Sequence, residues 1–326
     1  MGIKKLHLLF GLSIFAILLF FIFINIKPIS PKIEINEEET EISRGIIIID
    51  PSDLSIEIVE VTQLLEDDIV FEKYLSSMRN QKASNLRLKM YLETQDKQST
   101  SLSLLSTDTG NFSDFSPLLE FVNLEELRIR NHLLTDISGI KILSELEYLN
   151  YLLLDAEKVS NIGALSALVN LKTLVIEVAD ICTDASVLLS LENLEKLYFL
   201  QASSESIKYI AQLSRLKELG IRFSPLSNEF DITSLQNLTN LQKLYIWSPV
   251  NPPSIYPELD ISMLSHLKNL EHIELEGFTI KDIEPLLNLP NLSMVNVMFS
   301  KIDESNVMLL KNRTNALIFT EEDNDH

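Results

Sequence analysis

One pattern of six apolar positions recurs along the chain between Phe115 and Val297. The positions fall at a start residue and then 3, 6, 9, 12 and 14 residues further on. The eight copies start at Phe115, Ile137, Ile162, Ala185, Ile207, Ile232, Ile261 and Ile283, which are 22 to 29 residues apart. Of the 48 positions, 43 are Leu, Ile or Val. A period of this length predicts a solenoid whose repeats bury their apolar positions against one another.

The positions within one copy predict its local structure. The residue before the first apolar position is always Asp, Asn or Ser, whose side chains accept hydrogen bonds from free backbone amides. These residues are Asp114, Asp136, Asn161, Asp184, Ser206, Asp231, Asp260 and Asp282. The apolar residues three apart that follow predict a short helical or 3₁₀ segment. The last two positions are two apart, so they predict a strand whose alternate residues face outward.

These features resemble the 22-residue leucine-rich repeats of bacterial internalin-like surface proteins. Three copies begin with Asp, Ile, two variable residues and then Ile or Leu, at Asp136, Asp231 and Asp260. The resemblance covers residues 114–303 and implies an α/β leucine-rich repeat solenoid with a concave parallel sheet and short convex segments. The asparagine that such repeats usually carry three residues after the last apolar position is absent, so we expect less regular turns. Its places hold His132, Leu154, Ala179, Ala202, Ser224, Pro249, Phe278 and Ser300.

The segments outside the repeats predict an anchor and two caps. Residues 6–26 carry no charged residue and would span roughly 31 Å as a helix, about the thickness of a bilayer core. Residues 1–27 are therefore a transmembrane anchor, with a cleaved signal peptide and a buried helix as alternatives, and residues 28–44 are a polar spacer. Residues 45–113 are interpreted as an N-terminal cap with irregular leading repeats, and an independent small domain is the alternative. Residues 304–326 are a C-terminal cap and acidic tail.

Within the N-terminal cap the pattern predicts several elements. Residues 46–49 and 54–58 predict a pair of strands, and residues 62–79 a short amphipathic helix. The alternating run Leu86, Leu88, Met90 and the pair Leu102, Leu104 predict two further strands.

Composition narrows the class of protein further. The net charge of −20 disfavours nucleic acid, because binding phosphates releases counterions only to a basic surface. Cys182 is the one cysteine, so no intramolecular disulfide forms, which suits a bacterial envelope. We therefore expect a protein of the cell membrane with the repeats outside, or alternatively a secreted one.

The outward strand positions give a candidate binding surface. Tyr, Trp and Arg dominate the energetics of interfaces, and several of them fall at these positions. We predict a protein-binding patch of Tyr148, Tyr198, Arg222, Lys243, Tyr245 and Trp247. The repeat pattern also places Asn150 and Leu152 outward beside Tyr148. A proline-rich insertion at residues 248–257 is a second candidate, with a tolerated surface insertion as the alternative reading.

The sequence carries no motif for catalysis, and we expect no cofactor and no metal. Phosphate-binding loops, paired cysteines and metal-spaced histidines are all missing. The expected function is non-catalytic binding of a protein partner through the concave sheet. A structural envelope component that self-associates is the alternative.

Overall fold

The computed structural model of the chain describes residues 45–49, 56–60, 68–178, 184–226, 229–249 and 256–320. The chain divides into two compact units, Met1–Val70 and Phe71–His326. The N-terminal hydrophobic helix expected at residues 6–26 lies outside the described residues.

In the first unit, β1 (Gly45–Ile49) and β2 (Ile56–Glu60) pair antiparallel. Gly45 lies opposite Glu60, and Ile49 lies opposite Ile56. Isoleucine is β-branched and favours the extended backbone, which explains why these two runs form strands. The predicted pair of strands is confirmed, although the second begins at Ile56 rather than at residue 54.

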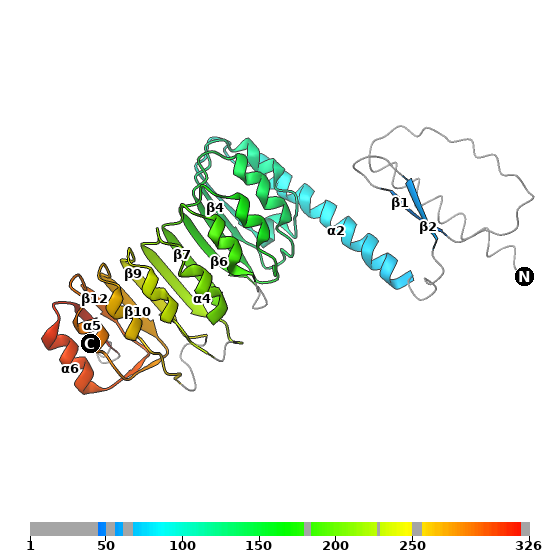
Figure 1. The fold of residues 1–326 in the computed structure, drawn as a ribbon. Coiled ribbons are helices and arrows are strands. Elements are labelled where there is room, and N and C mark those ends of the chain that lie inside the picture. Colours follow the sequence, from blue (N-terminus) through cyan, green and yellow to red (C-terminus); the bar gives the residue numbers. More distant parts are fainter. Residues whose placement is uncertain are drawn as a thin grey trace, which may run out of the picture. The chain divides into compact units, whose positions relative to one another are not determined.

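The second unit is built on a parallel sheet, which has ten strands among the described residues (Figure 1). The spatial order of the strands is β14-β12-β10-β9-β8-β7-β6-β5-β4-β3. They are β3 (Ser101–Leu105), β4 (Glu126–Arg130), β5 (Tyr151–Ala156), β6 (Thr173–Val178), β7 (Lys196–Ala202), β8 (Glu218–Phe223), β9 (Lys243–Trp247), β10 (His272–Glu276), β12 (Met294–Asn296) and β14 (Leu317–Phe319). A small second sheet pairs β11 (Thr279–Ile280) with β13 (Lys301–Ile302).

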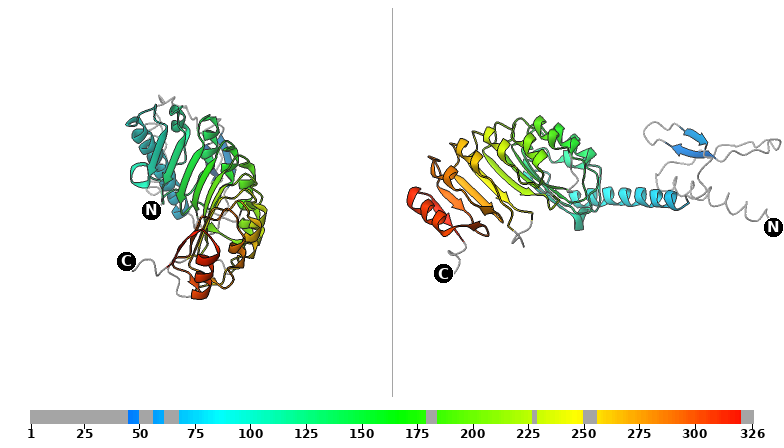
Figure 2. Two further views of the ribbon diagram at one scale, coloured as in Figure 1. Left: turned by 90° about the vertical axis from the view of Figure 1, so that its left-hand side faces the viewer. Right: turned by 60° about the horizontal axis from the view of Figure 1, so that its bottom comes forward.

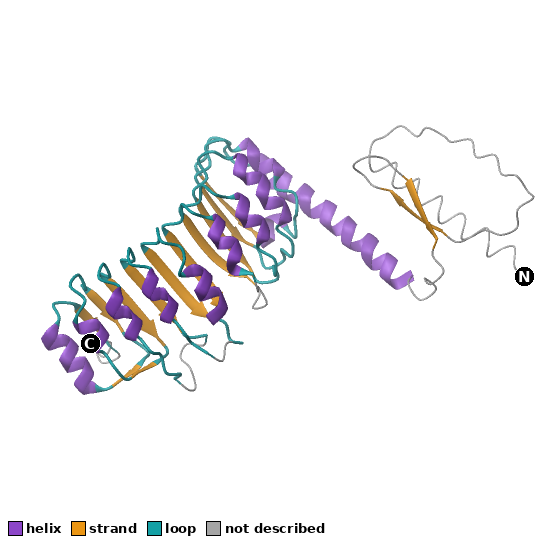
Figure 3. Cartoon of the chain, viewed as in Figure 1, coloured by secondary structure: helices purple, strands orange, loops and turns teal. Residues whose placement is uncertain are grey.

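Short helical segments connect successive strands and lie along one side of the sheet (Figures 2 and 3). They are η1 (Ser116–Glu120), η2 (Ser138–Glu145), η3 (Gly163–Ala167), η4 (Ala185–Ser190), α4 (Ser204–Ile210), η5 (Thr233–Asn237), η6 (Ser262–His266) and α5 (Glu284–Leu287), with α3 (Ser106–Thr109) after β3. Six of the nine are 3₁₀ segments, as the three-residue spacing predicts. The predicted solenoid is confirmed.

The apolar positions of the repeat pattern form the core between sheet and helical segments. Every one of them except Tyr151 is buried. Full burial of a leucine or isoleucine side chain contributes about 1.5–3 kcal/mol, so each repeat gains most of its stability from these positions.

The repeat that contains β5 departs from the pattern. The repeat pattern predicts that Leu149 and Tyr151 are the last two buried positions of this repeat, but the structure buries Leu149, Leu152 and Leu154. The chain takes one additional step of three residues here, and η2 has eight residues where η1 and η3 have five. The prediction that Leu152 faces outward is therefore wrong, and so is the placement of Tyr148 and Asn150 on the strand.

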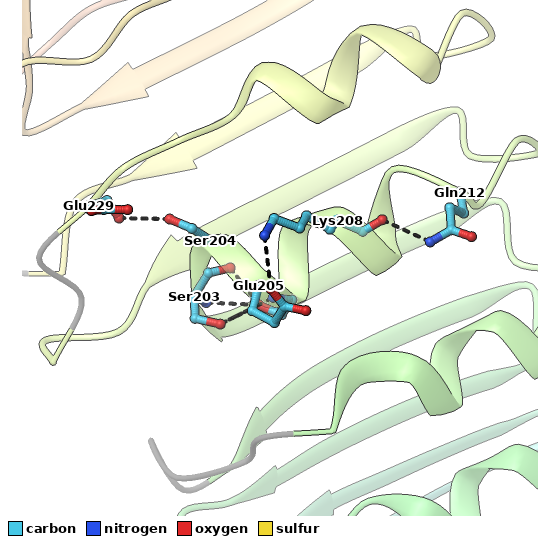
Figure 4. A network of polar contacts seen from close by, with 7 residues as sticks. Ser203, Ser204, Glu205, Lys208, Gln212 and Glu229 are labelled. Carbon is cyan, nitrogen blue, oxygen red and sulfur yellow. Dashed lines mark hydrogen bonds and ion pairs between the residues drawn. The ribbon is translucent and has the colours of Figure 1, made fainter.

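The polar residue that precedes each repeat acts as predicted in seven of the eight copies. Its side-chain oxygen accepts a hydrogen bond from the backbone N–H two residues on, at 2.8–3.0 Å. The exception is Ser206, which lies inside α4. There Ser203 is the N-cap: its hydroxyl accepts from the Ser206 N–H at 3.1 Å, and the Ser206 hydroxyl accepts from the Ser203 N–H at 2.8 Å (Figure 4).

Asparagines satisfy the backbone between repeats, but at a place that the sequence interpretation missed. Asparagine stands directly before the fourth apolar position in six of the eight copies. Asn193, Asn240, Asn269 and Asn291 each donate from Nδ2 to a backbone carbonyl of the preceding repeat, at 2.9–3.0 Å. At the place usual for internalin-like repeats, a single buried asparagine, Asn131, lies one residue early and donates to the Gly110 carbonyl at 2.6 Å.

The N-terminal end of the sheet is covered by a helix. The helix predicted at residues 62–79 is confirmed from Asp68 onward, and it continues beyond the predicted end to Glu93. Residues 68–93 form α2 (Asp68–Glu93), so the strand expected around Leu86, Leu88 and Met90 is wrong. Leu88 and Leu92 are four residues apart on one face of this helix and are buried, whereas Leu86 and Met90 are more than half exposed. The strand predicted at Leu102 and Leu104 is confirmed as β3.

The C-terminal end adds α6 (Glu304–Arg313) and the edge strand β14. Val307 and Leu310 of α6 are buried, and β14 pairs with β12. None of the helices within the described residues is long and apolar enough to span a bilayer.

Candidate functional site

The face of the large sheet opposite the helical segments presents the outward side chains of the strands; we call it the concave face. From β3 to β12 its residues are Ser101, Ser103, Leu105, Glu126, Arg128, Arg130, Tyr151, Leu153, Asp155, Thr173, Val175, Glu177, Lys196, Tyr198, Leu200, Glu218, Gly220, Arg222, Lys243, Tyr245, Trp247, His272, Glu274, Glu276, Met294 and Asn296. Within the described residues, no helix covers this face.

Five of the six predicted patch residues lie together on this face. Tyr198 is on β7, Arg222 on β8, and Lys243, Tyr245 and Trp247 are on β9. The sixth, Tyr148, lies in the turn between η2 and β5 and is 54% exposed. It occupies the turn position at which most other repeats have an asparagine.

The rings of Tyr198, Tyr245 and Trp247 form one aromatic platform. Their centroids are 5.9 Å (Tyr198–Tyr245), 6.3 Å (Tyr198–Trp247) and 5.8 Å (Tyr245–Trp247) apart, and the planes agree within 26°. In a single stack the outer two rings would be about twice as far apart as neighbours, so these three distances describe a triangle of rings lying beside one another. Such contacts are each worth about 0.5–1.5 kcal/mol.

Gly220 on β8 makes this platform possible. Tyr198 and Tyr245 are in register with Gly220 on the two flanking strands, about 9–10 Å apart across the sheet, yet their rings meet over the strand between them. A Cβ atom at Gly220 would lie 2.4 Å from Cδ1 of Tyr198 and 3.0 Å from Cζ3 of Trp247. Any other residue at this position would displace the rings.

A carboxylate fixes the platform on the β7 and β8 side. The Tyr198 hydroxyl donates to Glu218 at 2.5 Å, and the same carboxylate lies 3.3 Å from Lys196 and 4.0 Å from Lys243. Burial, this hydrogen bond and the charge of Glu218 raise the pKa of Tyr198 above its ordinary value of 10.0. Burial raises the pKa of Glu218, but the Tyr198 and Lys196 hydrogen bonds outweigh it, so that pKa is lowered. Glu218 is therefore charged and Tyr198 neutral at physiological pH.

A second carboxylate fixes the other side. Trp247 donates from Nε1 to Glu274 on β10 at 2.7 Å, and Asn296 donates to the other oxygen at 3.0 Å. Glu276 lies two residues further along the same strand, opposite Trp247. Burial, together with the charge of Glu274, raises the pKa of Glu276.

Arg222 is held beside the platform rather than within it. Its guanidinium forms an ion pair with Glu177 on β6, across Leu200 on the strand between them. Both side chains are about one-third exposed, and ion pairs so open to water contribute about 0–1 kcal/mol. The pair orients Arg222 along the sheet.

Three residues that build the site escaped the sequence interpretation as functional positions. Glu218 and Glu274 hold the aromatic rings, and Gly220 makes room for them. A signal for Gly220 was present, because glycine inside a strand marks the close approach of other groups. The carboxylate contacts have no such signal, since they depend on side-chain rotamers across strands.

The proline-rich insertion is described only at its two ends, and residues 250–255 lie outside the described residues. Ser248 is buried and its N–H donates to the Glu276 carbonyl at 2.9 Å. At the other end, Lys301 lies 4.6 Å above the ring of Tyr256.

The parallel sheet, the short segments opposite it and the buried leucine positions define a leucine-rich repeat protein. Its fold is similar to that of a solved internalin, in agreement with the resemblance in the sequence. The internalin InlF of Listeria monocytogenes is 23% identical, with 72% of this chain and 67% of that chain covered and a TM-score of 0.51. Internalin C2 of the same species is 25% identical, with 66% and 92% covered and a TM-score of 0.49.

A more distant structure, a TLR13–ssRNA13 complex, is 18% identical, with 62% of this chain and 29% of that chain covered and a TM-score of 0.45. No protein-family model matches the chain, and no curated protein sequence does. The likeness to InlF therefore supports the fold, and the function has to be argued from the site.

Proposed function

We propose that this protein binds a protein partner through its concave face, without catalysis, and that the aromatic platform is the centre of the contact. The observation that carries the proposal is the assembly of Tyr198, Tyr245 and Trp247 over Gly220 on an uncovered face of the sheet. Tyrosine and tryptophan bury large area at low cost in side-chain entropy, and they are enriched among the residues that dominate binding energy.

The platform is also rigid before any partner arrives. Its rings contact one another, and Glu218 and Glu274 fix the Tyr198 hydroxyl and the Trp247 indole N–H. A preorganised surface loses little conformational entropy on binding. The net charge of −20 supports a protein partner rather than nucleic acid.

We propose further that the protein is exported and that residues 6–26 hold it in the cell membrane with the repeats outside. The length and apolar character of that run support an anchor, and secretion after cleavage is the alternative. Amino-terminal sequencing of the mature protein separates the two, because an anchored chain retains residues 6–26. Protease treatment of intact cells then tests whether the repeats are outside.

A photocrosslinking experiment tests the binding face. A benzophenone side chain is placed at position 245 of the full chain in its native cells, and at position 148 as the matched control. We expect a crosslinked protein from position 245 and none in common from position 148. Crosslinks that form equally from both positions would place the contact elsewhere.

The purified crosslinked protein then gives the energetic test. We expect Trp247→Ala to weaken its binding by about 2 kcal/mol, roughly thirtyfold in Kd, because hot-spot truncations reach this size. Tyr148→Ala should leave binding unchanged. Equal affinities of the wild type and Trp247→Ala for the purified partner would refute the proposal.

Self-association is a second candidate, favoured by the exposed edge strand β14. Its outward residues Leu317 and Phe319 are 63% and 37% exposed, and unpaired strand edges are places where a further strand can add. Sedimentation of the detergent-solubilised full chain over a range of concentrations tests it. A rise in mass with concentration that Leu317→Lys abolishes would support self-association.

A further inference from the structure

The two carboxylates that hold the aromatic platform differ in how their charge is compensated. Glu218 has two ammonium groups nearby, Lys196 at 3.3 Å and Lys243 at 4.0 Å. The donors that the structure gives to Glu274 are the indole of Trp247 and the amide of Asn296, and both are neutral. An ionised carboxylate has about four acceptor sites, so each Glu274 oxygen retains capacity for a further hydrogen bond.

The charges around Glu274 add to this imbalance. Glu276 presents a second carboxylate on the same face of β10, and burial together with the charge of Glu274 raises its pKa. Among the described residues of the two strands that flank β10, the cation is Lys243 on β9, and its ammonium lies 4.0 Å from Glu218. Arg222, one strand further away on β8, is engaged by Glu177. The β10 side of the platform is therefore electronegative, next to the face of an indole ring.

This combination matches one side chain better than any other. A guanidinium is planar, so it stacks on an aromatic face, and its fork of N–H groups donates to a carboxylate in the same plane. Aromatic faces attract cations, and tryptophan does so most strongly. An ammonium is a strongly hydrated point charge that can use the carboxylates but gains less from the flat ring.

We propose that the protein partner inserts an arginine side chain on the β10 side of the platform, stacked on Trp247 and hydrogen-bonded to Glu274. The inference rests on the proposed function and specifies the chemistry of the partner at that contact. A cationic side chain on the partner also suits the net charge of −20 of the whole chain, which would accelerate the approach of a basic surface.

The single tryptophan of the chain gives a direct readout. The probes are acetylated and amidated pentapeptides with glycine at four positions and arginine, lysine, citrulline or glutamate at the centre. Citrulline has the shape of arginine without its charge. The full chain in detergent micelles is titrated with each peptide, and the fluorescence of Trp247 is followed with excitation beyond the absorption of tyrosine.

We expect saturable quenching by the arginine peptide, weaker binding of the lysine peptide, and no saturable response to citrulline or glutamate. Glu274→Gln, which keeps the shape and an acceptor, should weaken the arginine peptide by about tenfold, as loss of a charged hydrogen bond predicts. Glu192→Gln, at an exposed glutamate in the turn before β7, is the matched control and should leave the affinity unchanged. Thermal unfolding of both variants checks that each is folded.

Equal responses to arginine and citrulline would overturn the inference, as would an unchanged arginine affinity in folded Glu274→Gln. If these results occur while binding of the crosslinked partner still requires Trp247, the proposed function is retained and only the arginine contact is rejected. If partner binding is also independent of Trp247, both the proposed function and the arginine contact are rejected.

Discussion

Gly220 offers the sharpest test of the platform, because a single added methyl group should disrupt it. In Gly220→Ala the new Cβ would lie 2.4 and 2.7 Å from Cδ1 and Cε1 of Tyr198 and 3.0 Å from Cζ3 of Trp247. Contacts this short are not tolerated, so the Tyr198 ring has to move away from β8. Its hydroxyl then loses the position from which it donates to Glu218.

The magnitude follows from the contacts that Tyr198 makes. Its two ring contacts are worth about 0.5–1.5 kcal/mol each, and its hydrogen bond to a charged group about 1.5–3 kcal/mol. Replacing glycine by alanine returns about 0.4–1 kcal/mol by restricting the unfolded chain. Complete loss of the Tyr198 contacts would therefore destabilise the folded chain by about 2–5 kcal/mol, and we expect about 2 kcal/mol because a displaced ring keeps part of its contact.

Urea unfolding followed by Trp247 fluorescence measures this effect. The emission of folded Gly220→Ala should also shift to the red, because water reaches the indole when Tyr198 leaves. Gly163→Ala, in the short segment η3, is the matched control, because its new Cβ meets only the side chain of Asn161, at 3.0 Å. Equal stability of the two variants, with an unchanged emission of Gly220→Ala, would refute the reasoning that the rings rest on β8.

Three further predictions concern the rest of the fold. Leu88→Ala should destabilise the chain by about 2–5 kcal/mol in thermal unfolding, whereas Leu86→Ala on the exposed side of α2 should change little; similar losses would contradict the helical cap. Asn240→Ala should cost about 0.5–1.5 kcal/mol by removing a bond between repeats, and Asn237→Ala, with no such bond among the described residues, should cost less. The pKa of Glu276 is raised, so its carboxyl group keeps its proton to a higher pH in the folded chain than in the unfolded chain. The stability that this group contributes is therefore complete below the ordinary pKa of 4.5 and is lost as the pH rises through the raised pKa. Glu276→Gln should therefore gain stability relative to the wild type as pH rises, and a constant difference in Tm across that range would argue against it.

The sequence predicted the solenoid well because its core positions repeat. Leucine every three residues, followed by a spacing of two, has one simple solution in which all of these side chains are buried together. The polar residue before each copy was equally informative, since Asp and Asn accept from the first free amides of a short helical segment. Both signals are local and recur eight times.

The terminal caps were harder to predict because they do not repeat. Leu86, Leu88 and Met90 alternate as in a strand, while Leu88 and Leu92 are spaced as on a helix, and such a short run fits both periods. The edge strand β14 has only three residues, too few for a periodic signal.

The outward residues of the concave face could be predicted only in those repeats that follow the spacing of the apolar pattern. Tyr198, Tyr245 and Trp247 were placed correctly because their repeats follow the spacing, and Tyr148 was misplaced because its repeat does not. The ring contacts and their carboxylate partners lay beyond sequence reasoning, since they depend on how side chains on different strands turn toward one another.

The additional residues ahead of β5 show by what unit of length the helical part of a repeat can grow. A 3₁₀ helix has three residues per turn, and η2 is three residues longer than η1, so a whole turn was added. The buried positions on either side of a whole turn keep their phase, and Leu152 and Leu154 enter the core as their counterparts do in other repeats. An insertion of one or two residues would rotate every later leucine of that repeat out of the core. Engineered repeats of this protein should therefore accept segments in multiples of three at this point, which offers a way to reshape the curvature of the array without redesigning its core.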